Sequence, residues 1–323
     1  MKTAYLFPGQ GAQHVGMGKD LYEAYPAARR IFDQAEEVTG IPLRRLCFEG
    51  PEEQLARTDV GQPAIFAASA ATLAVMDDLL SPVQLESIEP DFVAGLSLGE
   101  YTALYAAGAI DFEPCLKLVT KRGELMQQAA ASQPSAMLSV IGLGPEQAQQ
   151  LCEAAGDGQL LTCANFNCPG QIVLSGHVEA CERAAELAEQ YGASGSVPLK
   201  VAGAFHSEIM APAAEVFAEE LDEVNFDELL VTVVANVDAQ AYGGTHQIKD
   251  KLTAQLVSPV RWQQSMEMLL AEGVETFYEI GPGRVLAGLM RRIDRKTRVT
   301  CLKDRSSVEK LLPVLARMPE GDA

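Results

Sequence analysis

The chain has 323 residues, about two domains at ~150 residues each, and 48% of them are hydrophobic and 21% charged. These proportions are ordinary for a globular protein and exclude general disorder. The 25 basic residues against 44 acidic ones give a formal net charge of -19, so a nucleic-acid binder would need a strong local basic patch.

The first part of the chain alternates short apolar runs with longer amphipathic segments. Residues 3–7, which a Pro-Gly pair follows, and residues 92–94 are predicted to be short buried strands. The composition and spacing of 17–38, 62–80 and 100–107 predict helices. Strands that alternate with helices indicate a parallel α/β sheet.

The middle of the chain has a different order of elements. Its pattern is βαββαβ, which is typical of a ferredoxin-like domain. The predicted elements are strand 136–141, helix 145–155, strands 160–164 and 171–175, helix 178–191 and strand 196–201. We therefore expect a small domain at 132–203, inserted into a larger one.

The α/β pattern resumes after the insertion. Residues 230–235 and 275–280 are apolar runs that predict two more strands, and a Gly-Pro-Gly turn follows the second. Residues 318–323 are expected to be a frayed tail. Residues 1–131 and 204–323 together would form the large domain.

A nucleophile motif lies between the strand at 92–94 and the next helix. The run Gly95-Leu96-Ser97-Leu98-Gly99 matches Gly-x-Ser-x-Gly, in which a sharp strand-to-helix turn exposes the serine hydroxyl. The glycines avoid a clash within the turn, and the N–H of Leu98 can point at a developing oxyanion. The alternative is a glycine-rich turn whose serine caps the helix. The context favours the motif, and the large domain is predicted to be α/β-hydrolase-like.

A serine nucleophile needs a base, which is most often histidine. Among four histidines, His206 is the best placed, because it lies where a predicted strand meets the next helix. The other three fit capping or solvent-facing roles: His14, His177 and His246. No Asp or Glu stands out as the third member of a triad, so some other group should orient the imidazole.

Seven collinear blocks together resemble the malonyl-CoA:acyl carrier protein transacylase family, and they span nearly the whole chain. They are Phe7–Gln13 (FPGQGAQ), Gly95–Leu104 (GLSLGEYTAL), Lys121-Arg122-Gly123 with Met126-Gln127, Ala164–Gly176 (ANFNCPGQIVLSG), Gly203–Met210 (GAFHSEIM), Gln255–Trp262 (QLVSPVRW) and Glu279–Gly283 (EIGPG).

This resemblance implies a role for each matching position. Ser97 would carry the acyl group as an ester, and His206 would be its base. The backbone carbonyl of Gln255 would orient His206 in place of a carboxylate. Arg122 would bind the free carboxylate of the malonyl group, because a guanidinium can clamp a carboxylate with two parallel hydrogen bonds. Without the family pattern, Arg122 would be interpreted as a surface charge on a helix beside Lys121.

The resemblance also implies an oxyanion hole formed by the N–H groups of Gln10 and Leu98. The neighbouring Gly9 and Gly11 would allow the backbone to approach the acyl group closely.

Further positions concern the shape of the acyl pocket. Phe205 resembles the malonyl-selective form of the family's specificity motif. Asn165 and Asn167 lie on the edge of the ferredoxin-like domain and would help to shape the acyl or pantetheine pocket, although both also suit a plain turn. The chain departs from the family at Leu96, where histidine is most common, which leaves the fine acyl selectivity open.

The implied reaction is a ping-pong transfer from malonyl-CoA to an acyl carrier protein, without a metal or organic cofactor. Both partners are acidic, so docking needs a local positive patch. The densest basic cluster consists of Arg291, Arg292, Arg295, Lys296 and Arg298. It is a candidate for docking the carrier protein, or else a solvated helix end.

Three alternative functions stay open. One is an editing acyl hydrolase of the same fold, against which Arg122 argues. The second is an acyltransferase of a polyketide pathway, and the third is an inactive module that binds carrier proteins. The seven cysteines are dispersed without a Cys-x-x-Cys pair, which indicates a reducing compartment. We expect a cytoplasmic monomer without a signal peptide, a membrane span or bound nucleic acid.

Overall fold

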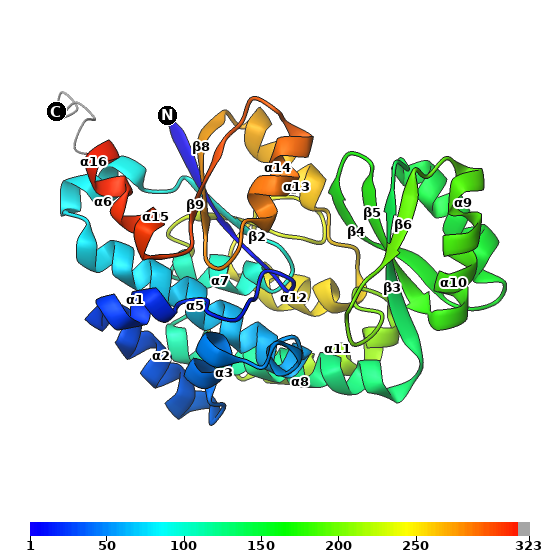
Figure 1. Cartoon of the computed structure of the whole chain (residues 1–323), viewed down its shortest axis with the longest axis horizontal. Helices are drawn as coiled ribbons and strands as arrows, with labels where there is room; N and C mark the ends of the chain where they lie inside the picture. Colours follow the sequence, from blue (N-terminus) through cyan, green and yellow to red (C-terminus); the bar gives the residue numbers. More distant parts are fainter. Residues whose placement is uncertain (316–323) are drawn as a thin grey trace.

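The computed structural model describes residues 1–315, so the tail expected at 318–323 lies outside the described residues. The chain forms two sheets that lie side by side (Figure 1). The larger sheet has five parallel strands in the order β7-β2-β1-β8-β9, and the smaller has four antiparallel strands in the order β4-β5-β3-β6. The strands are β1 (Lys2–Phe7), β2 (Phe92–Gly95), β3 (Ser135–Ile141), β4 (Leu161–Cys168), β5 (Gln171–His177), β6 (Gly195–Pro198), β7 (Thr232–Val234), β8 (Val274–Ile280) and β9 (Val299–Leu302).

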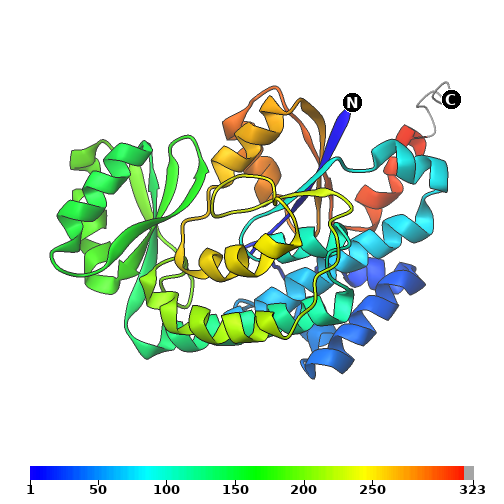
Figure 2. The ribbon, with the colours of Figure 1, turned by 180° about the vertical axis from the view of Figure 1, so that it is seen from behind.

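Helices cover both faces of the large sheet, as the two opposite views show (Figures 1 and 2). Alternate side chains of β1 explain this arrangement, because successive residues of a strand point to opposite faces. Tyr5 and Phe7 join a core formed with α2 (Pro26–Thr39), α5 (Thr58–Leu79), α7 (Gly99–Ala106) and α8 (Phe112–Ser132). Ala4 and Leu6 join a second core formed with α13 (Trp262–Ala271) and α14 (Val285–Ile293). The α/β fold with a parallel sheet, predicted from the sequence, is confirmed.

Two helices of the large-sheet part correspond to the single helix that the sequence predicts over residues 17–38. Residues 17–38 form α1 and α2, separated by Tyr25 in extended conformation. Pro26 causes the break, because a proline disfavours helical geometry in the residue before it. The bounds are α1 (Lys19–Ala24), α2 (Pro26–Thr39), α3 (Leu43–Glu49), α4 (Glu52–Leu55), α5 (Thr58–Leu79), α6 (Pro82–Ile88), α7 (Gly99–Ala106), α8 (Phe112–Ser132), α11 (Ala211–Asp222), α12 (Ile248–Val257), α13 (Trp262–Ala271), α14 (Val285–Ile293), α15 (Arg305–Glu309) and α16 (Leu311–Leu315), with the short 3-10 helices η2 (Glu208–Met210) and η3 (Thr245–Gln247).

The small sheet has the strand order of a ferredoxin-like fold, as its βαββαβ pattern predicts. Its helices α9 (Pro145–Gly156) and α10 (Val178–Leu187), the latter continued by the 3-10 helix η1 (Ala188–Tyr191), cover one face. Leu138 and Leu174 pack against these helices, whereas their neighbours Met137 and Val173 belong to the core of the large sheet. The second face of the small sheet is therefore turned towards the large sheet.

Backbone hydrogen bonds attach the small sheet to the other one. The N–H of Phe166 donates to the carbonyl of Val260 at 2.9 Å, and the N–H of Val260 donates to the carbonyl of Ala164 at 2.8 Å. Ser175 Oγ donates to the carbonyl of Phe205 at 2.7 Å, which anchors the segment that returns from the small sheet. These contacts set the width of the space between the sheets.

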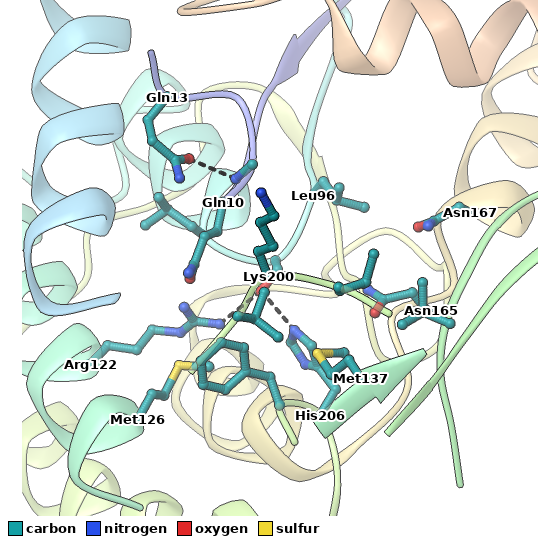
Figure 3. Close-up of a pocket in the computed structure, with 17 residues that line it drawn as sticks. Gln10, Gln13, Leu96, Arg122, Met126, Met137, Asn165, Asn167, Lys200 and His206 are labelled. Atoms are coloured by element: carbon teal, nitrogen blue, oxygen red, sulfur yellow. Dashed lines mark hydrogen bonds between the residues drawn. The ribbon is translucent and has the colours of Figure 1, made fainter. Parts of the chain in front are cut away.

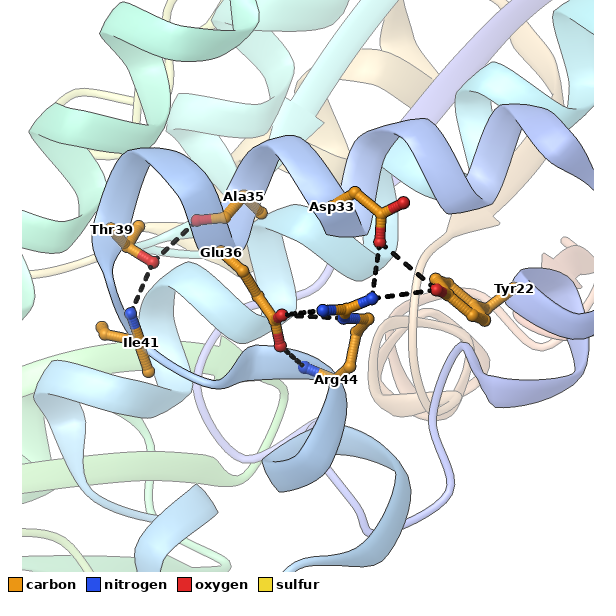
Figure 4. Close-up of polar contacts among 7 residues, drawn as sticks. All are labelled: Tyr22, Asp33, Ala35, Glu36, Thr39, Ile41 and Arg44. Atoms are coloured by element: carbon orange, nitrogen blue, oxygen red, sulfur yellow. Dashed lines mark hydrogen bonds and ion pairs between the residues drawn. The ribbon is translucent and has the colours of Figure 1, made fainter.

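Arg44 joins α2 to α3 at the edge of the molecule (Figure 4). Its N–H and Nε donate to the two carboxylate oxygens of Glu36, each at 2.7 Å. Its Nη1 donates to Asp33 Oδ1 at 2.8 Å and to Tyr22 Oη at 3.0 Å. Because the Arg44 side chain is 41% exposed, each ion pair contributes at most ~1 kcal/mol, and the cluster mainly sets the angle between the helices.

Within residues 1–315, one helix, α5, is long and apolar enough to cross a membrane by length and composition. However, 78% of its most apolar 18-residue window is buried inside the protein. It contacts α8 and α2 and lies at the centre of the larger core, so its apolar composition has a packing explanation.

Candidate active site

Ser97 lies at the carboxyl end of β2, in a turn that leads into α7. Its φ is 51°, which is a strained left-handed conformation for a residue with a side chain. A Cβ on Gly95 would lie 1.9 Å from the backbone of Gly99, and one on Gly99 would lie 2.1 Å from the Phe7 carbonyl oxygen. The two glycines are therefore required by close backbone contacts, and the turn has the form that Gly-x-Ser-x-Gly predicts.

Replacing Gly95 by alanine should destabilise the protein by at least ~2 kcal/mol, because backbone atoms must move to admit the new Cβ. A matched control is Gly288→Ala, since a Cβ there meets nothing within 4 Å on an exposed turn of α14. That control should gain about 0.5–1 kcal/mol from helix propensity. Chemical unfolding of both variants checks this, and equal stability of the two would contradict it.

His206 lies next to Ser97 and is held by a backbone carbonyl. The Oγ of Ser97 is 2.8 Å from Nε2 of His206, and Nδ1 of the same ring is 2.8 Å from the carbonyl oxygen of Gln255. A carbonyl can only accept a hydrogen bond, so Nδ1 carries the proton and Nε2 is free to accept one from Ser97. His206 itself has a φ of 56°, and its side chain is buried.

Burial, followed by the positive charge of Arg122, lowers the pKa of His206 from 6.5 to about 4, although hydrogen bonding to the Gln255 carbonyl opposes this. Above that pKa the imidazole is neutral and able to accept a proton. We therefore expect Ser97 to react with phenylmethylsulfonyl fluoride at a constant rate from about pH 8 to about pH 5, and more slowly towards pH 4. A rate that is halved near the ordinary histidine value of 6.5 would contradict the lowered pKa.

Arg122 projects from α8 towards Ser97 and is only 1% exposed. Its Nη2 donates to Ser97 Oγ at 3.0 Å and to Gln255 Oε1 at 2.9 Å, and its Nη1 donates to Gln62 Oε1 at 2.7 Å. The guanidinium also lies 5.3 Å from the centre of the Tyr101 ring. In residues 1–315 no carboxylate oxygen lies within 4.0 Å of it, so this buried cation has only neutral acceptors. The alternative of a surface charge on a helix is wrong for Arg122.

A second group of polar side chains lies behind the nucleophile turn, and sequence reasoning did not identify it. Asn236 Oδ1 accepts from the N–H of Ser97 at 2.6 Å, and Asn236 Nδ2 donates to the Gly95 carbonyl at 2.7 Å. Asn236 follows the carboxyl end of β7, a position where polar residues of parallel sheets often form sites, so a signal existed. Gln62 also had a signal, because it is a polar residue within a mostly apolar helix.

Ser97, Arg122 and His206 lie at a cavity of about 290 Å³ between the two sheets (Figure 3). The large-sheet part contributes Gln10, Leu96, Ser97, Leu98 and Arg122 to the lining, with Phe205 and His206 from the segment that returns from the small sheet. The small sheet and the loop after it contribute Met137, Asn165, Asn167, Val173 and Lys200. The structure therefore brings the predicted site residues together around one cavity, except for Gln255, which lies behind the lining.

The turn after β1 packs against the nucleophile turn. A Cβ on Gly9 would lie 2.2 Å from the carbonyl oxygen of Leu96. This contact gives a packing reason for Gly9, and the expectation that it also makes room for the acyl group stays a prediction. Within residues 1–315, the N–H groups of Gln10 and Leu98 donate to no protein acceptor. Both residues line the cavity described above. The same part of the chain holds no group of three or more His, Cys, Asp or Glu side chains placed to bind a metal ion.

The chain is similar to known acyltransferases over almost its full length. The family described as "Acyl transferase domain" matches residues 4–320. The malonyl CoA-acyl carrier protein transacylase of Bacillus subtilis is 44% identical over 315 residues, which are 97% of each chain.

Solved structures show the same similarity. An acyl carrier protein S-malonyltransferase from Vibrio cholerae has a TM-score of 0.90 at 42% identity and covers 96% of this chain and 100% of its own. A malonyl-transacylase solved in complex with a type II PKS acyl-carrier protein has a TM-score of 0.92 at 39% identity and covers 97% of this chain and 100% of its own. The chain therefore belongs to the acyl transferase domain family, and within it to the malonyl-CoA:acyl carrier protein transacylases.

Proposed function

We propose that the protein transfers a malonyl group from malonyl-CoA to the phosphopantetheine thiol of an acyl carrier protein, through an ester on Ser97, and that it supplies fatty acid synthesis. This proposal rests on the position of Arg122, whose Nη2 lies 3.0 Å from the Ser97 Oγ in the same cavity. A buried guanidinium without an acidic partner favours an acyl group that brings its own carboxylate. The names of the relatives in Bacillus subtilis and Vibrio cholerae support the same acyl group.

In the first half-reaction, Ser97 Oγ attacks the thioester carbonyl while Nε2 of His206 accepts the hydroxyl proton. The negative charge on the carbonyl oxygen faces the free N–H groups of Gln10 and Leu98. When the C–S bond breaks, the imidazolium returns its proton to the CoA sulfur. The Gln255 carbonyl stabilises the imidazolium between these steps, because it accepts from Nδ1.

In the second half-reaction, His206 accepts the proton of the carrier-protein thiol, and the thiolate attacks the ester carbonyl on Ser97. The C–O bond breaks, and the proton passes from His206 to Ser97 Oγ. The chain's own groups supply every proton transfer and the charge stabilisation, so we propose that neither half-reaction uses a metal or an organic cofactor.

Selectivity would come from the cavity wall beside Ser97. We propose that Phe205 limits the size of the acyl group and that Asn165 and Asn167 contact the acyl or pantetheine chain. All three line the cavity, and Asn167 Oδ1 is buried without a hydrogen-bond partner among the described residues. Leu96 presents an aliphatic side chain to the same cavity, in place of a polar contact.

The basic cluster at the end of α14 is our proposed docking site for the carrier protein. Its five side chains are exposed, and Arg292 Nη1 donates to Gln171 Oε1 at 2.9 Å, so the cluster adjoins the β4–β5 hairpin of the small sheet. Reversing Arg291 and Arg292 to glutamate should raise the KM for the carrier protein about tenfold at low salt. Steady-state kinetics with a matched pair on α2, Arg29→Glu with Arg30→Glu, provides the control. An unchanged KM would mean that the cluster does not dock the carrier protein.

The domain boundaries and the cellular location are also proposals. We propose a catalytic domain at 1–131 and 204–323 and a small domain at 132–203, since all four strands of the small sheet lie within that interval. A cytoplasmic location is supported by the cysteines, all seven of which are free thiols.

Intact-protein mass spectrometry tests the reaction. Brief mixing with malonyl-CoA should give a malonyl adduct on the wild type and none on Ser97→Ala, and acetyl-CoA should give little adduct. Adding an acyl carrier protein that bears its phosphopantetheine should then discharge the adduct onto the carrier. Steady release of CoA without an adduct, or discharge of the adduct to water at the same rate without the carrier, would favour the hydrolase instead.

A further inference from the structure

Glu100 is a buried carboxylate that the proposed chemistry does not use. It lies in the first turn of α7, is 1% exposed and does not line the cavity. Its Oε1 accepts from Tyr242 Oη at 2.5 Å, and its Oε2 accepts from Gln255 Nε2 at 2.5 Å and from the N–H of Asn236 at 3.1 Å. A carboxylate buried with three donors indicates a defined role, since an unpaired buried carboxylate would be strongly destabilising.

The side chain of Gln255 connects this carboxylate to the guanidinium. Its Nε2 donates both to Glu100 Oε2 and to the Ser97 carbonyl, the latter at 3.1 Å, whereas its Oε1 accepts from Arg122 Nη2 at 2.9 Å. A carboxylate and a carbonyl are acceptors only. Turning the amide over would place its oxygen against two other oxygens, so Glu100 and the Ser97 carbonyl together determine that Oε1 faces Arg122.

This connection leaves the cavity side of Arg122 free. A carboxylate bonded directly to the guanidinium would compete with the carboxylate of a substrate. Here the negative charge lies one side chain away, and only neutral oxygens touch Arg122. Burial raises the pKa of Glu100 to about 7, and its hydrogen bonds and the charge of Arg122 oppose this, so Arg122 favours the ionised form of Glu100.

We propose that Glu100 is a positioning residue for Arg122, because it orients the Gln255 amide that holds the guanidinium beside Ser97, and that it thereby sets the preference for an acyl group with a carboxylate. This inference rests on the proposed function. Glu100 also supports Ser97 through Asn236, but that support serves every acyl group equally. The ratio of malonyl to acetyl transfer therefore separates the two effects.

The test is the rate of Ser97 acylation by malonyl-CoA and by acetyl-CoA, measured under single-turnover conditions by intact mass. Glu100→Ala should lower the malonyl-to-acetyl ratio on the order of tenfold. Glu100→Gln should keep the ratio within about threefold of wild type, because its oxygen can accept from Gln255 and Asn236 while its amide donates to Tyr242.

Two further variants make the result specific. Glu279→Gln is a matched control, since Glu279 is equally buried but bonds to the N–H groups of Leu286 and Ala287 at the start of α14. It should not change the ratio. In the Arg122→Ala background, Glu100→Ala should have no further effect on the ratio, because its effect passes through Arg122.

Gln255→Met keeps the test decisive if Glu100→Ala does not fold. Methionine keeps the chain length and the backbone carbonyl that His206 needs, but it removes the amide, so the ratio should again fall on the order of tenfold. A ratio within about twofold of wild type in the folded variant overturns the proposal. An equal fall in the Arg122→Ala background also overturns it. A wild type without any preference for malonyl would instead contradict the proposed function itself.

Discussion

Replacing His206 by alanine should lower the rate of Ser97 acylation by malonyl-CoA by about 10²–10⁴-fold. The alcohol of a serine is a weak nucleophile, and the imidazole at 2.8 Å is the group placed to accept its proton. The remaining rate would come from the N–H groups of Gln10 and Leu98 and from substrate binding. Rapid-quench mixing with detection of the acyl adduct measures the effect directly.

The other histidines provide the control for this experiment. His246 is exposed in the segment between β7 and α12, and His246→Ala should leave the acylation rate unchanged. The thermal stability of His206→Ala should be measured in parallel, because the side chain is buried. A folded His206→Ala variant that retains more than about a tenth of the wild-type rate would show that another group is the base.

Replacing Arg122 by alanine should lower kcat/KM for malonyl-CoA by about 10²–10³-fold while acetyl-CoA is affected far less. The malonyl carboxylate would enter a buried site that no longer holds a cation, and an unpaired buried charge costs several kcal/mol. An acetyl group has no charge to leave unpaired. The two substrates, compared in the same half-reaction, therefore separate loss of the clamp from general damage to the site.

Two variants define what the arginine contributes. Arg122→Lys keeps the charge but loses the planar pair of donors, so it should recover only part of the preference for malonyl. Arg183→Ala removes a different part-buried arginine, which donates to the carbonyls of Ala155 and Gly156 in the small sheet's helices. That change should lower stability without altering the preference. An unchanged preference in Arg122→Ala would remove the basis of the proposed substrate.

The parts of the site that depend on local structure were predictable from the sequence. The turn around Ser97 needs small residues on either side because its backbone folds on itself, and that requirement is visible as a five-residue motif. The βαββαβ order of the small sheet was equally visible, because each element has its own hydrophobic period. The break at Tyr25 could have been predicted from Pro26, whereas the short strand β9 has no distinct local signal.

The support behind the site was not predictable in the same way. Glu100 follows the nucleophile by three residues, but its partners come from α12 and from the segment around β7. Gln62 reaches Arg122 from α5, which is 60 residues away in sequence. No spacing rule links such positions, so the sequence does not indicate an acid as the third member of a triad. In the structure the backbone carbonyl of Gln255 accepts from His206, and the carboxylate of Glu100 accepts from the side chain of Gln255 instead.

Residue periods and short motifs were sufficient to predict the two kinds of sheet, the nucleophile turn and the family. Only the packing of the folded chain showed that Arg122 is buried beside Ser97, that the cavity lies between the two sheets, and that Glu100 reaches Arg122 through Gln255. The physical reason is that burial and charge pairing are properties of packed elements. A charged residue on a helix has the same local pattern whether it faces water or a neighbouring strand.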